Sequence, residues 1–360
     1  MTWILTPARE FAAHAAAWQQ LNTECTASPL LEPAFVAPLL TEFGDGSELL
    51  ARFERDGRLL AMAIVQRRRI GAWETFQPSQ APVGMWLSHP GLDIDMLTGT
   101  LLRALPGFAL VLGVTQRDPM LAPRPLDGAL LRTLDYIDTA RITIRGSFDD
   151  YWAARGKNLR TNMKKQRSKL QKEGVEAHME VVRDPQQVAA ALADYGQLES
   201  AGWKAGGGTA IHADNAQGRF YRAMLENFCR AGRGRILRYR FDDRLVAMNL
   251  CIEGNGALII LKTTYDESVS SQYSPAFLLC EEVCRELFEQ QQFERLEFYG
   301  KVMEWHTRWT DEVRTMYHVN SYRWAALPRL RKLINNRARP PQAAPAPAAP
   351  ALQQTTPSME

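Results

Sequence analysis

The feature that most constrains the fold is an order of secondary-structure signals that occurs twice along the chain. In each half, two strand-like segments flank a dipeptide typical of a tight hairpin turn, Asp56-Gly57 in the first half and Asp242-Asp243 in the second. Helices and further strands surround both hairpins. This order predicts an α/β fold, with a mixed sheet and helices packed on its faces. The halves share no evident sequence identity, so the duplication is one of elements rather than residues.

The individual elements are predicted from apolar periodicity and from the positions of glycine and proline. The predicted strands span residues 48–53, 59–67, 108–114, 136–144, 235–241, 245–252, 257–264, 295–299 and 316–324. The predicted helices span residues 97–105, 188–203, 220–231 and 275–290. Gly232 and Gly234 are placed to end the helix that precedes them.

A chain of 360 residues is long enough for two domains of about 150 residues each. We expect an N-terminal lobe over residues 1–148, a basic connecting helix over 149–174 and a C-terminal lobe over 175–330. Residues 339–360 are rich in proline and alanine and contain few large apolar side chains. Such a segment buries too little surface to offset its ordering entropy, so we expect a disordered tail.

Charge and cysteine content exclude several functional classes. The net charge of +3 is too small for a whole surface built to bind nucleic acid. The five cysteines and six histidines show no ligand spacing, which predicts no metal site and favours a reducing compartment. The chain shows no secretory signal and no run near the roughly 18 uncharged apolar residues of a membrane span. We therefore expect a cytoplasmic protein without a membrane span.

The predicted connecting helix is strongly basic. Leu159, Met163 and Leu170 lie at helical spacing and would seat one of its faces on the body of the protein. Three interpretations stay open: a solvated helix, an anion-binding face for a substrate or phosphorylated cofactor, or a surface for nucleic acid or membrane. The basic residues are Arg155, Lys157, Arg160, Lys164, Lys165, Arg167, Lys169 and Lys172.

The segment that most resembles a binding site runs from residue 261 to residue 281. A strand ends, a loop of small polar residues follows, and a helix begins with Ser274 as a good N-cap and Pro275 at the first helical position. The first turn of such a helix presents free backbone N–H groups at the positive end of the helix dipole. It can therefore hold a pyrophosphate without a basic side chain.

Short motifs from about residue 26 to residue 325 are similar to one family in their order and spacing. The chain resembles the CelD-type acetyltransferases of bacterial cellulose and exopolysaccharide gene clusters, which belong to the GNAT superfamily and are related to the Fem peptidyltransferases. The matching segments are residues 28–35, Asn158-Leu159-Arg160, Glu199-Ser200-Ala201-Gly202-Trp203-Lys204, Gly208-Thr209-Ala210, 262–266 and Tyr273-Ser274-Pro275. The resemblance implies two tandem GNAT-like lobes, of which the first is a degenerate copy that shapes the acceptor cleft.

The resemblance further implies acyl transfer from acetyl-CoA or another acyl-CoA to an amine or hydroxyl of a small-molecule or saccharide acceptor bound between the lobes. Such a reaction needs alignment of donor and acceptor, a stabilised oxyanion and removal of one proton. Candidate catalytic residues are Glu199, Tyr265, Asp266 and His306. Candidate cofactor-binding residues are Lys262, Thr263, Tyr273, Ser274, Pro275, Ala276 and Phe277. Candidate substrate-binding residues are Arg160, Lys164, Trp203, Lys204, Glu304 and Trp305.

No single residue is assigned as the general base, although His306 has the most suitable unperturbed pKa, about 6.5. The chain departs from the family at Ala276, where glycine is usual, and at Trp305-His306, where an aromatic-lysine pair is usual. Two alternatives therefore stay open. One is a Fem-like transferase that uses aminoacyl-tRNA, gripped by the basic helix. The other is an inactive GNAT-fold adaptor of a polysaccharide synthase complex.

Overall fold

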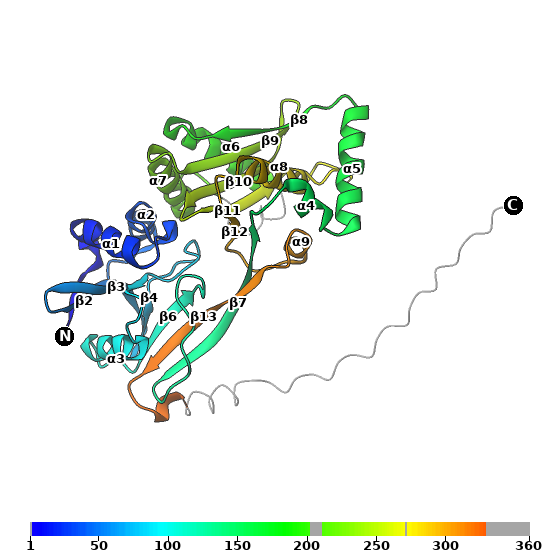
Figure 1. Ribbon diagram of the computed structural model, residues 1–360. Coiled ribbons are helices and arrows are strands. Elements are labelled where there is room, and N and C mark those ends of the chain that lie inside the picture. Colours follow the sequence, from blue (N-terminus) through cyan, green and yellow to red (C-terminus); the bar gives the residue numbers. More distant parts are fainter. Residues whose placement is uncertain (1, 202–210, 271, 329–360) are drawn as a thin grey trace, which may run out of the picture.

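The computed structural model describes residues 2–201, 211–270 and 272–328. These residues form one thirteen-stranded mixed sheet with helices on its faces (Figure 1), so the predicted α/β class is confirmed. The tail expected over residues 339–360 lies outside the described residues. The strands are β1 (Thr2–Pro7), β2 (Leu49–Arg55), β3 (Arg58–Arg69), β4 (Ala72–Thr75), β5 (Trp86–Ser88), β6 (Val111–Arg117), β7 (Leu131–Thr143), β8 (Ala177–Val182), β9 (Gly234–Phe241), β10 (Arg244–Gly254), β11 (Ala257–Tyr265), β12 (Arg295–Phe298) and β13 (Val313–Tyr322).

The helices cover the sheet and connect its strands. The α-helices are α1 (Phe11–Cys25), α2 (Pro33–Phe43), α3 (Ile94–Ala104), α4 (Phe148–Ala153), α5 (Lys157–Lys172), α6 (Val188–Ala201), α7 (Ala216–Arg230), α8 (Pro275–Gln290) and α9 (Glu304–Thr307). Short 3-10 helices are η1 (Ala8–Glu10), η2 (Pro29–Leu31) and η3 (Pro185–Gln187). Both predicted hairpins are confirmed, because β2 pairs with β3 and β9 pairs with β10 in antiparallel register.

Two long strands join the halves of the sheet. The strand order is β1-β2-β3-β4-β6-β13-β7-β12-β11-β10-β9-β8, with β5 paired to β3. Strand β13 follows the second half in sequence, but it lies between β6 and β7, which both belong to the first half. Figure 1 shows β7 and β13 as a long ribbon that reaches from one half to the other. The halves of the sheet therefore do not coincide with the halves of the sequence.

The halves also share one hydrophobic core on the face covered by α1, α2, α6 and α7. The ring of Phe220 on α7 meets Phe35 and Phe43 on α2 at centroid distances of 5.5 and 5.7 Å. Arg233 and Glu32 form a two-pronged ion pair between the halves. Packed side chains thus join the two halves around Phe220 on this face of the sheet.

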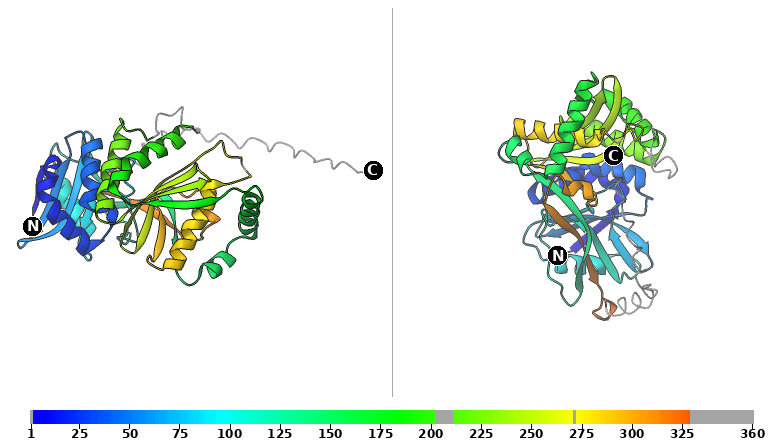
Figure 2. Two further views of the ribbon diagram at one scale, coloured as in Figure 1. Left: turned by 90° about the horizontal axis from the view of Figure 1, so that it is seen from above. Right: turned by 90° about the vertical axis from the view of Figure 1, so that its right-hand side faces the viewer.

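The basic segment is not one helix. The helix predicted over residues 149–174 is two helices, α4 and α5, because the extended backbone of Gly156 (φ −54°, ψ 137°) separates them and caps the second. Figures 1 and 2 show α5 on the outer side of the second half, away from the first half. It connects the halves in sequence only, and it packs against α8 through Arg167, whose Nε lies 2.8 Å from Glu281 Oε2.

Candidate active site

Two irregularities open the sheet beside α8. The register of β10 and β11 shifts between Leu250, which pairs with Lys262, and Cys251, which pairs with Ile260. Leu261 is therefore the extra residue of a β-bulge, which breaks the alternation of side chains along β11. Parallel pairing of β11 with β12 extends from Ala257 only to Ile260. Strand β12 ends there at Phe298, and β11 continues to Tyr265 without this neighbour.

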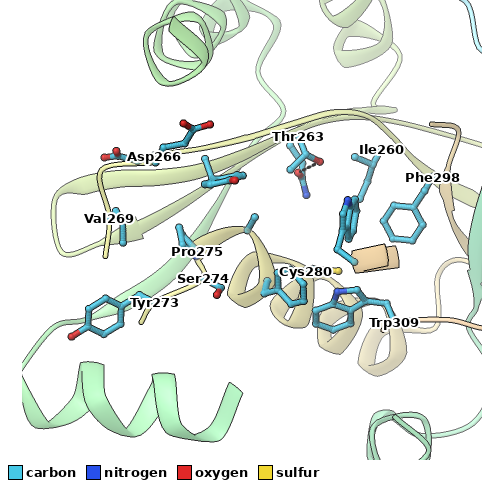
Figure 3. A pocket seen from close by; sticks show the side chains of 16 residues that line it. Ile260, Thr263, Asp266, Val269, Tyr273, Ser274, Pro275, Cys280, Phe298 and Trp309 are labelled. Carbon is cyan, nitrogen blue, oxygen red and sulfur yellow. Dashed lines mark hydrogen bonds between the residues drawn. The ribbon is translucent and has the colours of Figure 1, made fainter. Parts of the chain in front are cut away.

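A cavity of about 840 Å³ lies beside the end of β11 that extends beyond β12. Ile260 and Thr263 on β11 and Phe298 on β12 line its strand side, as Figure 3 shows. Its opposite wall is the start of α8, and Trp305 and Trp309 close its apolar end. The cavity therefore runs from an aromatic end near the bulge to a polar end at the start of a helix.

The start of α8 lines this cavity, and Ser274 stands at the N-cap position with Pro275 after it, as predicted. Its hydroxyl makes no bond to a helix N–H. Instead, Gln166 on α5 donates from Nε2 to Ser274 Oγ (3.2 Å) and accepts from the Ser274 N–H (3.3 Å). The N–H groups of Phe277 and Leu278 both donate to the Ser274 carbonyl. Among the described residues, none accepts a hydrogen bond from the Ala276 N–H, which remains for a ligand.

Two candidate residues in the loop before α8, Asp266 and Tyr273, have their polar groups engaged in hydrogen bonds. Asp266 lies 2.7 Å from Arg244 Nη2. Although burial opposes it, hydrogen bonds from Ser268 and Arg244 lower the pKa of Asp266, so its carboxylate is a weak base. The hydroxyl of Tyr273 donates to Glu173, which raises the pKa of Tyr273. Tyr265 is 45% exposed and lines the cavity without such a bond in the described part of the chain.

Lys262 lies apart from the cavity. The bulge turns its side chain towards α6, where its Nζ lies 3.1 Å from Oε1 of the buried Glu199 carboxylate. The same carboxylate accepts the Ile211 N–H at 2.8 Å. The rings of Tyr195 and Tyr221 face the ammonium at 5.8 and 5.6 Å. Lys262 was expected to contact the cofactor, whereas the structure pairs it with Glu199 on the opposite face of the sheet.

His306 on α9 is buried, and it does not line the cavity, although its neighbour Trp305 does. Its Nδ1 accepts the Met303 N–H at 2.9 Å, and its ring stacks on Trp305 at a centroid distance of 3.6 Å. Burial lowers the pKa of His306 from its ordinary 6.5 to about 4, so the unperturbed value that made it a candidate base does not apply in the folded protein. Glu304 is exposed and pairs with Arg308 (2.8 Å).

Acid is expected to destabilise the protein through His306. The unfolded imidazole titrates near 6.5 and the folded one near 4, so the unfolded state binds the proton first as the pH falls. The free energy of unfolding therefore decreases between pH 6.5 and 4, by about 2–3 kcal/mol for this group. His306→Asn keeps an acceptor for the Met303 N–H but cannot titrate. Urea unfolding at pH 7 and pH 4.5 should show a smaller loss for this variant. His212→Asn, at an exposed site, should behave as the parent, and an equal loss in all three proteins would contradict the prediction.

The substrate-binding candidates of the basic segment do not converge on the cavity. Arg160 is half-buried and donates to the Arg155 carbonyl (3.0 Å), whereas Lys164 is exposed on α5. Trp203 and Lys204 lie outside the described residues. Of the substrate candidates that the structure describes, Trp305 alone lines the cavity.

The sequence analysis missed Asn249, a buried polar residue in the cavity wall. It lies on β10, is 4% exposed, and accepts the Thr263 hydroxyl at 2.8 Å through Oδ1. This bond orients the amide with its Nδ2 donors away from Thr263. The available signal was a lone amide in the apolar run Val246–Ile252, where an unpaired polar side chain is costly.

Residues 157–307, which hold the cavity, match the family described as an acetyltransferase (GNAT) domain. Over these residues the chain is similar to a GNAT acetyltransferase domain, and the protein is an acyltransferase. No curated protein matches its sequence.

Solved structures resemble the whole fold. The C-terminal domain of a putative lysylphosphatidylglycerol synthetase from Agrobacterium fabrum is 12% identical and covers 90% of this chain and 96% of its own, with a TM-score of 0.55. FemX is 8% identical, covers 93% and 100%, and has a TM-score of 0.54. A protein of unknown function from Bacteroides thetaiotaomicron is 10% identical, covers 86% and 97%, and has a TM-score of 0.51. These likenesses show the fold alone.

No described helix is long and apolar enough to cross a membrane. No group of three or more His, Cys, Asp or Glu side chains in the described part of the chain is arranged to hold a metal ion.

Proposed function

We propose that the protein transfers an acyl group from acyl-CoA to an amine or hydroxyl, with the donor in the cavity beside α8. The observation that carries this proposal is the course of the cavity, from the end of β11 beyond its pairing with β12 to the start of α8. A thioester arm needs a slot beside a strand, and its pyrophosphate needs backbone donors at a helix start. The cavity offers both at its two ends.

We assign each part of acyl-CoA to residues that line the cavity. The Ala276 N–H and the dipole of α8 bind the pyrophosphate, and Tyr273, Ser274, Pro275 and Phe277 shape its seat. The pantetheine arm passes Thr263, where the Nδ2 donors of Asn249 are available to its carbonyl oxygens. By analogy with the GNAT superfamily, backbone N–H groups at the Leu261 bulge stabilise the oxyanion. Tyr265 is then the candidate that returns a proton to the departing thiolate.

The acceptor side is the face that carries Glu199. This carboxylate is next to the bulge through Lys262, and Trp203 and Lys204 follow it in sequence. We propose that the acceptor amine or hydroxyl approaches from this face and that the first lobe, residues 1–148, shapes its approach. The resemblance to CelD-type enzymes supports a saccharide acceptor in exopolysaccharide or cellulose biosynthesis.

Calorimetry with acetyl-CoA and with CoA lacking its thiol tests the donor assignment. Both ligands should bind with similar affinity, because the nucleotide and pantetheine contribute most contacts, and acetyl-CoA should support transfer to amino-sugar acceptors. Failure to bind either ligand at millimolar concentration would contradict the proposal.

One observation favours aminoacyl-tRNA as the alternative donor. Helix α5 contacts the cavity wall through the hydrogen bond of Gln166 with Ser274, and it exposes four lysines: Lys157, Lys164, Lys165 and Lys172. If these lysines bind RNA phosphates, tRNA binding should weaken steeply with salt. Salt-dependent tRNA binding together with no CoA binding would select this alternative over the acyl-CoA proposal.

A further inference from the structure

Three neighbouring turns of the first half expose large apolar side chains at one end of the sheet. We call this group the apolar tip; its exposed fractions are 87% for Ile70, 59% for Phe108 and 51% for Trp324. Backbone hydrogen bonds hold the turns together, because Leu110 donates to Gly71 (2.7 Å) and Arg323 donates to Leu110 (2.9 Å). The rings of Phe108 and Trp324 lie 5.8 Å apart.

The backbone at Phe108 is unusual for an aromatic residue. Its φ is +51°, next to Gly107 at +73°, so both residues of this turn adopt the left-handed region. A bulky side chain is disfavoured there, and burial does not compensate for it, since most of the ring is exposed. The turn therefore holds an aromatic side chain in solvent against the local preference of the backbone, and such outliers gather where a side chain has a use.

Arginines surround the apolar tip. Arg323 stacks its guanidinium on the Phe108 ring at 4.3 Å. Arg67 and Arg69 are exposed on the strand that leads to Ile70, and among the described residues neither has a carboxylate partner. Arg68, between them, pairs with Glu74. In the sequence, five more basic residues follow Trp324: Arg329, Arg331, Lys332, Arg337 and Arg339.

We propose that the apolar tip and its arginines bind the surface of an anionic phospholipid membrane. Tryptophan and phenylalanine favour the boundary between headgroups and acyl chains, and guanidinium groups pair with lipid phosphates. The charge around the tip selects an anionic surface. Three side chains on projecting turns can enter a headgroup layer directly, whereas a protein partner would have to supply a matching pocket. The protein is thereby a peripheral membrane protein, independently of its acyl donor.

Vesicle sedimentation of the full chain tests this inference. The protein should sediment with vesicles that contain phosphatidylglycerol and remain in solution with vesicles of phosphatidylcholine alone, and salt should weaken the binding. Phe108→Ser with Trp324→Ser should lower the partition coefficient at least tenfold, and Arg67→Ser with Arg69→Ser should do the same for anionic vesicles. The control, Val181→Ser, lies on β8 at the opposite edge of the sheet and should bind as the parent.

Two outcomes would overturn the inference. One is no binding to anionic vesicles, which would leave a protein partner as the explanation of the exposed rings. The other is unchanged binding by the Phe108→Ser, Trp324→Ser variant, which would assign the affinity to the basic residues after Trp324 alone. Acyl-CoA calorimetry on the same variant should be unchanged, because the apolar tip contributes nothing to the cavity lining. A failure of membrane binding is thus distinct from a failure of the acyl-CoA proposal.

Discussion

Ala276→Trp is expected to abolish measurable acyl-CoA binding. Ala276 is the second residue of α8, lines the cavity, and has an N–H that no described residue occupies. An indole at this position fills the polar end of the cavity and keeps an anion away from the helix start. We expect the affinity to fall about a hundredfold or more, equivalent to roughly 2.7 kcal/mol. Calorimetry with acetyl-CoA measures the change.

Two controls separate this effect from general damage to the fold. Ala223→Trp places the same indole on an exposed position of α7 and should bind acyl-CoA as the parent does. Ala276→Gly removes the methyl group beside the phosphate seat and should retain or improve the affinity, since the backbone can approach the anion more closely. A folded Ala276→Trp protein with parental affinity would exclude the start of α8 as the donor's phosphate seat.

Local signals predicted the elements whose residues specify their own conformation. The hairpin turns at Asp56-Gly57 and at Asp242 have positive φ angles, which aspartate and glycine tolerate better than most residues. The helix predicted over residues 275–290 is α8, with proline at its first position. In both cases a short stretch of sequence contains the whole reason for the structure.

Local signals of this kind do not predict which strands pair with one another across the sheet. The predicted strand at 316–324 exists as β13, but nothing in its composition places it between β6 and β7. Strand β1 and helices α1 and α2 were not predicted. The apolar stripe of α1 is broken by many small residues, and much of α2 is apolar because it is packed between α1 and α7. Their structure depends on what packs against them, which the sequence does not display.

The candidate site also combines features that have a local sequence signal with features that depend on distant residues. The sequence predicted the helix start at Pro275, whereas the bulge at Leu261 has no local signature and reverses the faces of the residues after it. That reversal brings Thr263 into the cavity and turns Lys262 away from it. The low pKa of His306 was equally hidden, because it results from burial by residues distant in sequence.

Lys262→Met is expected to cost about 3–5 kcal/mol of the free energy of unfolding. The Glu199 side chain is fully buried, and Lys262 Nζ lies 3.1 Å from it. Removal of the lysine takes a cationic partner from a buried carboxylate, and the loss of a charge partner in the interior is strongly destabilising. Urea denaturation of the variant and parent measures the loss. Arg222→Met, which breaks an exposed ion pair with Glu226 on α7, should cost no more than about 0.5 kcal/mol.

The double variant Glu199→Gln, Lys262→Met distinguishes a catalytic role of this ion pair from a structural one. With both charges removed, most of the lost stability should return, because the interior no longer holds a carboxylate that has lost its lysine. A stable double variant that binds acyl-CoA but does not transfer the acyl group would place the pair at the acceptor, where Glu199 removes or orients the proton. A stable and active double variant would make the pair a structural element that fixes the bulge. The lysine variant alone cannot distinguish these roles, since its instability would lower activity in either case.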